Sequence, residues 1–391
     1  MKLIPYSRTT FLIFSIFLCF GSCKSGSDYK QLEELQSLKK YAAGVYSGGG
    51  ASVICVLETV EAMQLDQEFA ISSISPIDIQ KGKLDSLDVL IFPGGSGSKE
   101  YLSLGQSGVQ KVREFARKEG KGLVGICAGG YLFATMEGYP SLQLLNAGTF
   151  RDHYDRGRGL IAFDLNDKGK EIFHELSAHD TLFLQYYDGP IYRIPQNAPP
   201  LVLGTIISDI AIRTGYPKYL TPGKPSFLTA SFGEGKIMVT VGHPESTPGM
   251  RWLVPRMARY VIDAPLVTYD STVIRPDINQ KEILYLSDII ALENNSRWGL
   301  YSDQDSIVLA SLKNLHSIRS RPSIRWSTGL LRHRASSVRI AAALYLMESE
   351  YTSAIPELAS AARFEENPRV QAVLEEVIGK LSEMKGNNRT P

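Results

Sequence analysis

The fold of this chain is indicated most directly by one stretch, Val124-Gly125-Ile126-Cys127-Ala128-Gly129-Gly130. The short apolar run predicts a buried strand, and the glycines around Cys127 predict a tight turn into a helix. Such a turn strains the backbone of its residue and exposes the side chain above a parallel sheet. The N-terminus of the following helix favours a thiolate. Cys127 is therefore a candidate nucleophile.

A candidate base and its carboxylate partner follow much later, in the run Gly242-His243-Pro244-Glu245. His243 is expected to take the proton of Cys127, and Glu245 to orient the imidazole, as in a catalytic triad with cysteine in place of serine. Each half has a structural alternative, a packed cysteine or a surface turn. Their occurrence in one chain favours catalysis.

A second glycine turn, Phe92-Pro93-Gly94-Gly95, ends another apolar strand. Backbone N–H groups of Gly94 or Gly95, together with that of Ala128, are predicted to form the oxyanion hole that such a nucleophile requires. Four further residues are candidates for the pocket lining, although packing of the tyrosines and a surface ion pair of the arginine explain them equally well: Tyr46, Tyr131, Arg158 and Tyr187.

Strands and helices alternate along the first part of the chain, which predicts an α/β fold with a parallel sheet and helices on both faces. The ligand site then lies at the carboxyl ends of the strands. Predicted strands and helices of this part are 41–46, 52–65 (helix), 69–74, 88–92, 107–119 (helix) and 122–126. Beyond residue 148 the pattern predicts mostly strands, at 160–165, 181–186, 201–207, 227–232 and 237–241, and a closing helix at 251–261.

The N-terminus resembles a bacterial lipoprotein signal. Lys2 and Arg8 precede an apolar run at 11–20 that is too short to span a membrane, and small residues precede Cys23. We expect residues 1–22 to be removed, Cys23 to be lipidated, and residues 23–40 to be a tether. An uncleaved anchor and an ordinary secretory signal are the alternatives. All three put the protein outside the cytoplasm, in the periplasm or on the cell surface, and the lipid on Cys23 would make the membrane a partner.

Composition narrows the function classes. The chain has 391 residues, 43% of them hydrophobic, and a formal net charge of +1, which becomes about −1 once residues 1–22 are removed. Nucleic acid is therefore not an expected partner. Cys55 lies in a predicted helix and is expected to be structural, because no spacing pattern supports a bridge to Cys127. No Cys-x-x-Cys or His-x-x-x-His occurs, so neither a metal nor another cofactor is predicted.

The C-terminal part is of a different kind. A polar segment at 265–303 is predicted to be a linker after the domain at 41–264, and residues 304–391 have helical periodicity. The runs 337–344 and 368–374 share a Val-Arg or Arg-Val core at a spacing of roughly 31 residues, which resembles HEAT-type repeats. A plain helical bundle is the alternative. An array of this sort would bind a protein partner or pack on its neighbour.

Six motifs in order give a family resemblance that covers about residues 41–264. They resemble the N-terminal domain of eukaryotic biotin-protein ligases, within the type 1 glutamine amidotransferase-like group. The resemblance implies a flavodoxin-like sheet with a Cys-His-Glu arrangement. The motifs are Gly44-Val45-Tyr46-Ser47-Gly48-Gly49-Gly50-Ala51-Ser52, Leu90-Ile91-Phe92-Pro93-Gly94-Gly95, Gly125-Ile126-Cys127-Ala128-Gly129-Gly130-Tyr131, Arg156-Gly157-Arg158-Gly159, Tyr186-Tyr187-Asp188-Gly189-Pro190 and Gly242-His243-Pro244-Glu245.

The resemblance does not imply biotin ligation, because the catalytic domain of the ligases has no counterpart in this sequence. Cys127 is followed by Ala128-Gly129-Gly130-Tyr131, whereas glutamine amidotransferases usually carry a side chain here that holds glutamine. This departure argues against glutamine as the substrate.

Three functions are compatible with these observations. The leading one is an extracytoplasmic thiol hydrolase or acyl-transferase that acts on an amide or related acyl bond of a small molecule or peptide. The second is a catalytically inactive binding or scaffold protein that uses the helical repeats. The third is a redox sensor with Cys127 as its reactive thiol.

Overall fold

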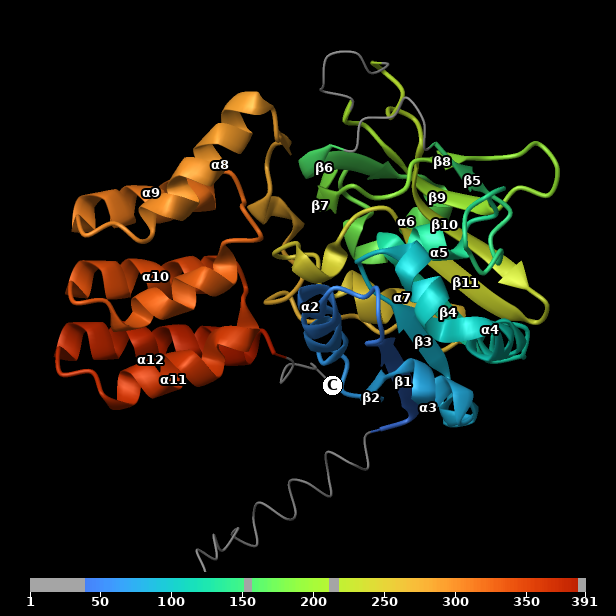
Figure 1. Ribbon diagram of the computed structural model, residues 1–391, viewed down its shortest axis with the longest axis horizontal. Coiled ribbons are helices and arrows are strands. Elements are labelled where there is room, and N and C mark those ends of the chain that lie inside the picture. Colours follow the sequence, from blue (N-terminus) through green and yellow to red (C-terminus); the bar gives the residue numbers. More distant parts are fainter. Residues whose placement is uncertain (1–38, 151–156, 211–217, 386–391) are drawn as a thin grey trace, which may run out of the picture. The chain divides into compact units, whose positions relative to one another are not determined.

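The computed structural model describes residues 39–150, 157–210 and 218–385. The predicted signal, Cys23 and the tether up to residue 38 lie outside the described residues. Figure 1 shows a strand-rich part followed by a helical part, in chain order. The α/β architecture with a C-terminal helical region is thus confirmed.

A ten-stranded sheet forms the core of the first part, in the order β12-β6-β9-β10-β11-β4-β3-β1-β2, with β7 paired to β6. A separate two-stranded sheet joins β5 (Gly148–Thr149) and β8 (Tyr192–Arg193). The strands of the large sheet are β1 (Tyr41–Tyr46), β2 (Phe69–Ile74), β3 (Val89–Phe92), β4 (Gly122–Ile126), β6 (Arg158–Leu165), β7 (Leu182–Tyr187), β9 (Leu201–Ile206), β10 (Pro225–Phe232), β11 (Gly235–Thr240) and β12 (Ile283–Leu284).

The half of the sheet that contains β1 to β4 is parallel, and β11 joins it in the same direction. The other half is antiparallel, from β10 through β9 and β6 to β7 and β12. The two residues Gly233 and Glu234 connect β10 to β11 in a hairpin. Because β11 lies beside β4, the segments that follow these two strands meet at the same edge of the sheet.

Helices cover both faces of the parallel strands, because alternate residues of each strand are buried on opposite sides. In β3, Leu90 and Phe92 pack with the helices α4 and α5, whereas Val89 and Ile91 pack with α2 and α7. The helices of this part are α2 (Val53–Met63), α3 (Pro76–Gln80), α4 (Gly97–Phe115), α5 (Ala128–Phe133), α6 (Asp167–Ile172) and α7 (Leu253–Val261).

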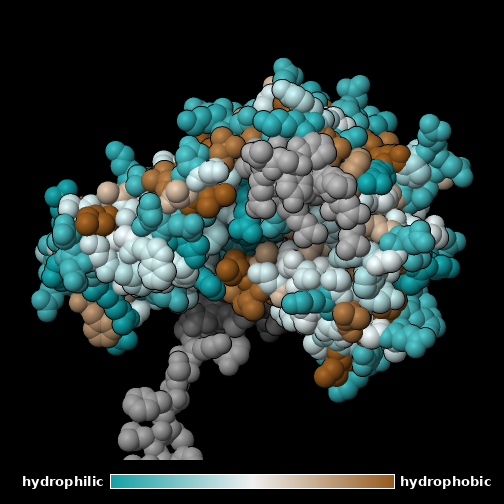
Figure 2. Space-filling model, turned by 45° about the horizontal axis from the view of Figure 1, so that its top comes forward, coloured by the Kyte–Doolittle hydropathy of each residue, from teal (hydrophilic) through white to brown (hydrophobic). Residues whose placement is uncertain are grey.

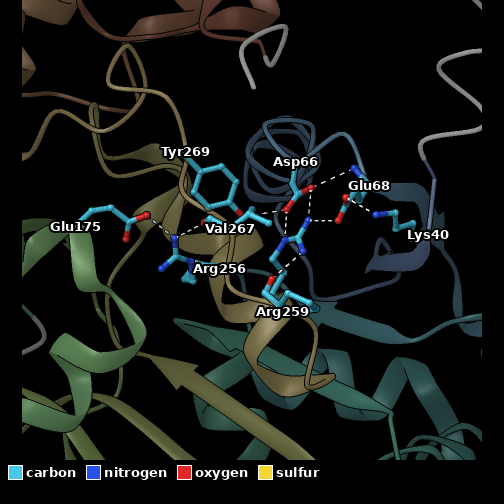
Figure 3. Close-up of polar contacts among 9 residues, drawn as sticks. Lys40, Asp66, Glu68, Glu175, Arg256, Arg259, Val267 and Tyr269 are labelled. Atoms are coloured by element: carbon cyan, nitrogen blue, oxygen red, sulfur yellow. Dashed lines mark hydrogen bonds and ion pairs between the residues drawn. The ribbon is translucent and has the colours of Figure 1, made fainter. Parts of the chain in front are cut away.

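A buried ion-pair network fixes α7 to the loop before β2. Arg259 is fully buried, and its Nη2 donates to Asp66 Oδ1 at 2.9 Å and to Glu68 Oε2 at 2.6 Å. The hydroxyl of Tyr269 donates to Asp66 Oδ2 at 3.0 Å. Figure 3 shows the guanidinium of Arg259 pointing at both carboxylates. Removal of Arg259 would leave the buried carboxylate of Asp66 without a cation, so the network fixes the position of this helix.

The helical region begins earlier than predicted. Part of the segment predicted as a linker, 265–303, forms β12 and α8, because two of its residues pair with Gly159 and Leu160 of β6. Figure 1 shows the helices from α8 onward as a stack. They are α8 (Ser287–Gly299), α9 (Asp305–Ser317), α10 (Ser336–Glu348), α11 (Ile355–Arg363) and α12 (Pro368–Glu383). Both repeat-like runs are helical, in α10 and α12; their HEAT-type character stays a prediction.

Polar contacts join this region to the sheet-bearing part. Arg251 Nη1 donates to the carbonyl oxygen of Glu350 at 2.9 Å, and the N–H of Gly249 donates to Glu350 Oε1 at 3.0 Å. Thr352 Oγ1 donates to Glu61 Oε2 in α2 at 2.6 Å. The described residues of the two regions accordingly form one compact unit.

The surface is mixed in character. On the face shown in Figure 2, hydrophobic residues form small separate groups among hydrophilic ones. Groups of this size are ordinary on a surface that faces water. Among the described helices, none is both long enough and apolar enough to cross a membrane.

Candidate functional site

Cys127 occupies the turn between β4 and α5, and its backbone is strained. Its φ is 50° and its ψ is −99°, values that a residue with a Cβ rarely adopts. Its N–H donates to the carbonyl oxygen of Thr240 at 3.0 Å, which ties the turn to β11. Strain of this kind costs on the order of 1–3 kcal/mol and persists only where the surroundings hold it. The turn therefore has the geometry of a nucleophile elbow.

His243 reaches the same point from the neighbouring strand. Ile126 of β4 pairs with Thr240 of β11, so Cys127 and the segment with His243 leave the sheet side by side. The N–H of His243 donates to the carbonyl oxygen of Gln185 at 2.7 Å, and its carbonyl accepts from Thr247 Oγ1 at 2.7 Å. These bonds fix the backbone of the histidine.

Glu245 holds the imidazole of His243. The distance between His243 Nδ1 and Glu245 Oε1 is 2.8 Å, and both side chains are buried. With Nδ1 engaged by the carboxylate, Nε2 is the ring nitrogen left for a thiol. The ring of Tyr187 packs edge-on against the imidazole, with ring centroids 6.3 Å apart. The structure thus brings Cys127, His243 and Glu245 into one constellation.

A cavity of about 600 Å³ opens beside Cys127 and His243. Its wall comes from the ends of β3 and β4, from α2, from the segment after β7 and from the helical region. A cavity of this volume is in the range of small-molecule sites. The residues that line it are Ser52, Ile54, Cys55, Gly95, Ser96, Gly97, Ser98, Cys127, Ala128, Tyr131, Tyr139, Tyr187, Asp188, His243, Arg321 and Pro322.

The three residues predicted for the oxyanion hole are not equivalent. Gly95 and Ala128 line the cavity, but Gly94 does not. The carbonyl oxygen of Gly94 accepts from the N–H of Ser52 at 2.9 Å. A Cβ at Gly94 would lie 2.6 Å from Cε1 of His243, so this glycine leaves room for the imidazole. Gly95 and Ala128 are the better placed candidate donors.

The four predicted pocket residues divide into two groups. Tyr131 and Tyr187 line the cavity; Tyr131 donates its hydroxyl to the carbonyl oxygen of Gly189 at 2.9 Å. Tyr46 lies in the core, stacked on a phenylalanine, and burial raises its pKa to about 12. Arg158 is half exposed and pairs with Asp188 at 3.1 Å, as the structural alternative predicted. Tyr46 and Arg158 are therefore not lining residues.

Cys55 and Arg321 are among the lining residues that the sequence did not assign to the site. Cys55, expected to be structural, lines the cavity from α2. Arg321 enters from the segment between α9 and α10, and its Nη2 lies 3.8 Å from Cys55 Sγ and 3.7 Å from Glu245 Oε1. It also pairs with Glu58 of α2. No local motif identifies Arg321 as a site residue. The sequence offers only one signal for it, its position beside Pro322 in the segment between two helices.

Burial and charge perturb the titration of the site. Burial raises the pKa of the Cys127 thiol, and the charge of His243 offsets this only in part. The thiol donates to the carbonyl oxygen of Tyr187 at 3.3 Å. Burial alone would lower the pKa of His243, but the charges of Cys127 and Glu245 raise it well above its usual value. The expected low-pKa thiolate at Cys127 is therefore not favoured in the resting site.

Cys55 differs from Cys127. Burial works to raise the pKa of its thiol, but the charge of Arg321 and a hydrogen bond to His243 lower it to about 7. Among the described residues, candidate metal donors come together in one group, Cys55, His243 and Glu245, whose donor atoms lie within 4.8 Å of one another. The guanidinium of Arg321 lies against two of these three donors, and like charge disfavours a divalent cation there.

Comparisons with known proteins agree with this architecture. Residues 42–138 match the family described as "Biotin-protein ligase, N terminal". The chain is 29% identical over 173 residues to the pyridoxal 5'-phosphate synthase subunit PdxT of Listeria monocytogenes serotype 4b (strain F2365). The aligned residues make up 44% of this chain and 77% of that protein.

Similar solved structures include the Trypanosoma brucei CTPS glutaminase domain with bound acivicin, with a TM-score of 0.40 and 12% identity over 59% of this chain and 97% of that one. Another is β-galactosidase from Bacillus circulans sp. alkalophilus, with a TM-score of 0.36 and 12% identity over 61% of this chain and 34% of that one. The family resemblance drawn from the motifs is confirmed for residues 42–138, which are similar to the biotin-protein ligase N-terminal family, and the likeness to PdxT agrees with a glutamine amidotransferase-like fold.

Proposed function

We propose that this protein is a cysteine-dependent hydrolase or acyl-transferase that cleaves an amide or related acyl bond. One observation carries the proposal: the strained turn at Cys127 faces a cavity shared with an imidazole that a buried carboxylate orients at 2.8 Å. Backbone strain at a cysteine between a strand and a helix has no packing advantage, and a nucleophile elbow accounts for it.

Each residue has one task in the proposed reaction. Cys127 Sγ attacks the carbonyl carbon while His243 takes the thiol proton, and N–H groups of Gly95 and Ala128 donate to the developing oxyanion. The tetrahedral intermediate collapses as His243 returns the proton to the leaving amine. Water or an acceptor then releases the acyl group from the Cys127 thioester, with His243 as the base. Glu245 holds the ring throughout and stabilises the imidazolium.

The cavity supports an amide-bearing small molecule or peptide end as the substrate. Its wall combines the rings of Tyr131, Tyr139 and Tyr187 with the charged groups of Asp188 and Arg321. The motifs resemble those of the glutamine amidotransferase-like group, so glutamine is the natural reference compound. Tyr131 stands where glutamine amidotransferases usually hold glutamine, and we propose an amide other than glutamine.

Export and lipidation belong to the same proposal. Residues 1–22 and Cys23 support a lipoprotein on the outer side of a membrane, with the helical region available to a protein partner. Metabolic labelling with a palmitate analogue tests this: the full chain should take up label, and Cys23→Ser should not. Label that remains in Cys23→Ser would refute lipidation at this residue.

The proposed enzymatic activity is tested by the alkylation rate of Cys127 as a function of pH. Mass spectrometry of the peptide that contains Cys127 follows the reaction. His243→Ala should slow alkylation at pH 8 roughly ten-fold or more, because the pKa of Cys127 then rises further. Exposed His174→Ala is the control. A panel of amides and activated acyl esters, with glutamine included, then seeks an acyl-Cys127 adduct. A Cys127 thiol that is indifferent to His243 and takes no acyl group would favour the scaffold alternative.

A further inference from the structure

Cys55 is the second free thiol of the cavity and has surroundings of its own. It lies near the start of α2, on the wall that also contains Cys127 and His243. Its sulfur lies 3.8 Å from Nη2 of Arg321, and a ring nitrogen of His243 and a carboxylate oxygen of Glu245 lie within 4.8 Å of it. The sulfur thus lies beside two groups that carry positive charge when protonated, with the Glu245 carboxylate as an opposing charge.

Arg321 provides the independent evidence that this part of the cavity receives an anion. Its side chain is 8% exposed, and its Nε has no hydrogen-bond partner among the described residues. A buried guanidinium requires anionic neighbours. Glu58 is one, Glu245 with its Oε1 at 3.7 Å from Nη2 is another, and the sulfur of Cys55 is in position to be a third.

The two thiols respond to these surroundings in opposite ways. The pKa of Cys55 is lowered to about 7, whereas burial raises that of Cys127. Near neutral pH, the thiolate of the cavity is therefore carried by Cys55. Thiolates are the form that peroxides oxidise, and a solvent-connected cavity gives small oxidants access.

We infer that Cys55, held beside Arg321 and His243, is an oxidation site that forms a sulfenic acid with hydrogen peroxide. The thiolate sulfur attacks one peroxide oxygen, an S–O bond forms and the O–O bond breaks. The sulfur loses two electrons, and the departing hydroxide takes a proton from the His243 imidazolium or from solvent to become water. Two equivalents of an added thiol reverse the step and release water and a disulfide of that thiol.

The modification has a consequence for the site. An added oxygen on Cys55 lies against His243 and Arg321, and it removes the negative charge of the thiolate. The imidazole that serves Cys127 is then obstructed, so oxidation reversibly lowers the activity. This last consequence rests on the proposed function, whereas the oxidation itself does not.

The experiment treats the purified full chain with hydrogen peroxide at pH 7, traps sulfenic acid with a dimedone-type reagent, and maps the two cysteine peptides by mass spectrometry. We expect the initial labelling rate of Cys55 to exceed that of Cys127 about ten-fold or more, from the difference in thiolate fraction. This comparison is made within one wild-type sample and needs no variant. Faster labelling of Cys127 overturns the inference.

Variants then test the role of the guanidinium. Arg321→Leu should lower the labelling rate of Cys55 roughly ten-fold, and the exposed Arg325→Leu on the next turn should leave it unchanged. Cys127→Ser should keep the label on Cys55, and Cys55→Ser should lose it. Unchanged labelling in a folded Arg321→Leu protein overturns the inference. Because the readout is a chemical adduct, failure of the proposed hydrolase activity would not affect it.

Discussion

Arg321 Nη2 lies 3.8 Å from the sulfur of Cys55, although 266 residues separate the two in the chain. The contact brings a charge from the helical region into a cavity that the sheet-bearing part otherwise forms. The same nitrogen pairs with Glu58, one turn after Cys55 on α2. The helical region therefore takes part in the electrostatics of the site.

Removing one partner of the Arg321–Glu58 pair should destabilise the fold more than removing both. Arg321→Leu leaves a buried carboxylate unpaired and is expected to lower the free energy of unfolding by about 3–5 kcal/mol. The double variant Arg321→Leu/Glu58→Leu should recover part of that loss. Urea unfolding of the wild type, the two single variants and the double variant measures these free energies. Lys168→Ala, which breaks an exposed pair, is the control. Additive single losses would show that the two charges do not interact.

The pH dependence of acylation should report the imidazole. Because the pKa of His243 is raised well above its usual value, the neutral base appears only as pH rises, and single-turnover acylation of Cys127 should increase through a midpoint above pH ~6.5. Glu245→Gln removes one charge that raises this pKa, so the midpoint should move to lower pH. The measurement is acyl-Cys127 formation from an activated ester by intact mass. A midpoint that stays in place would exclude Glu245 as the partner.

Gly94→Ala should impair the site more than it impairs folding. A Cβ there would lie 2.6 Å from Cε1 of His243 and 2.8 Å from Cys55 Sγ, so one or both side chains must shift. We expect acylation of Cys127 to fall at least roughly ten-fold, since small displacements of a general base are costly. Gly379→Ala, where nothing lies within 4 Å of the new Cβ, is the control. Equal activity of both variants would refute the close packing described.

Glu100 should make stability depend on pH. It is fully buried in α4, neither carboxyl oxygen has a hydrogen-bond partner among the described residues, and burial raises its pKa from 4.5 to about 8. The folded state therefore binds this proton more tightly than the unfolded state. The resulting stability is complete below pH 4.5 and is lost as pH rises towards 8.

Glu100→Gln does not titrate, so the stability of the wild type relative to this variant should fall by a few kcal/mol, to order of magnitude, between pH 4.5 and 8. Denaturant unfolding of both proteins across this range is the measurement. The exposed Glu114→Gln in the same helix is the control. A constant difference between wild type and Glu100→Gln would mean that Glu100 is ionised when folded.

Local pattern was enough to predict the parallel strands. The bounds of β1, β2 and β4 agree with the predicted 41–46, 69–74 and 122–126. β4 is buried throughout and β1 over most of its length, so both read as continuous apolar runs, whereas β2 is buried only at its two ends. The predicted helix at 107–119 is the second part of α4, which begins at Gly97. A non-helical Gly105, with a φ of 65°, interrupts the apolar period there and concealed the first part.

The site was predictable only where its residues follow strand ends. Cys127 and His243 follow two strands that pair, so topology brings them together. Arg321 follows no strand, and its place in the cavity depends on how the helices pack, which local periodicity does not determine. Cys55 looked structural because an apolar helix accommodates cysteine readily, and its neighbours Arg321 and His243 are remote in sequence.

The entry of Arg321 into the cavity restricts how this protein can change over time. A domain that only tethers or docks can be exchanged for another by recombination without consequence for its neighbour. Here, any exchange of the helical region would also remove the cation beside Cys55 and leave Glu58 buried without its partner. The two regions are therefore expected to be inherited together.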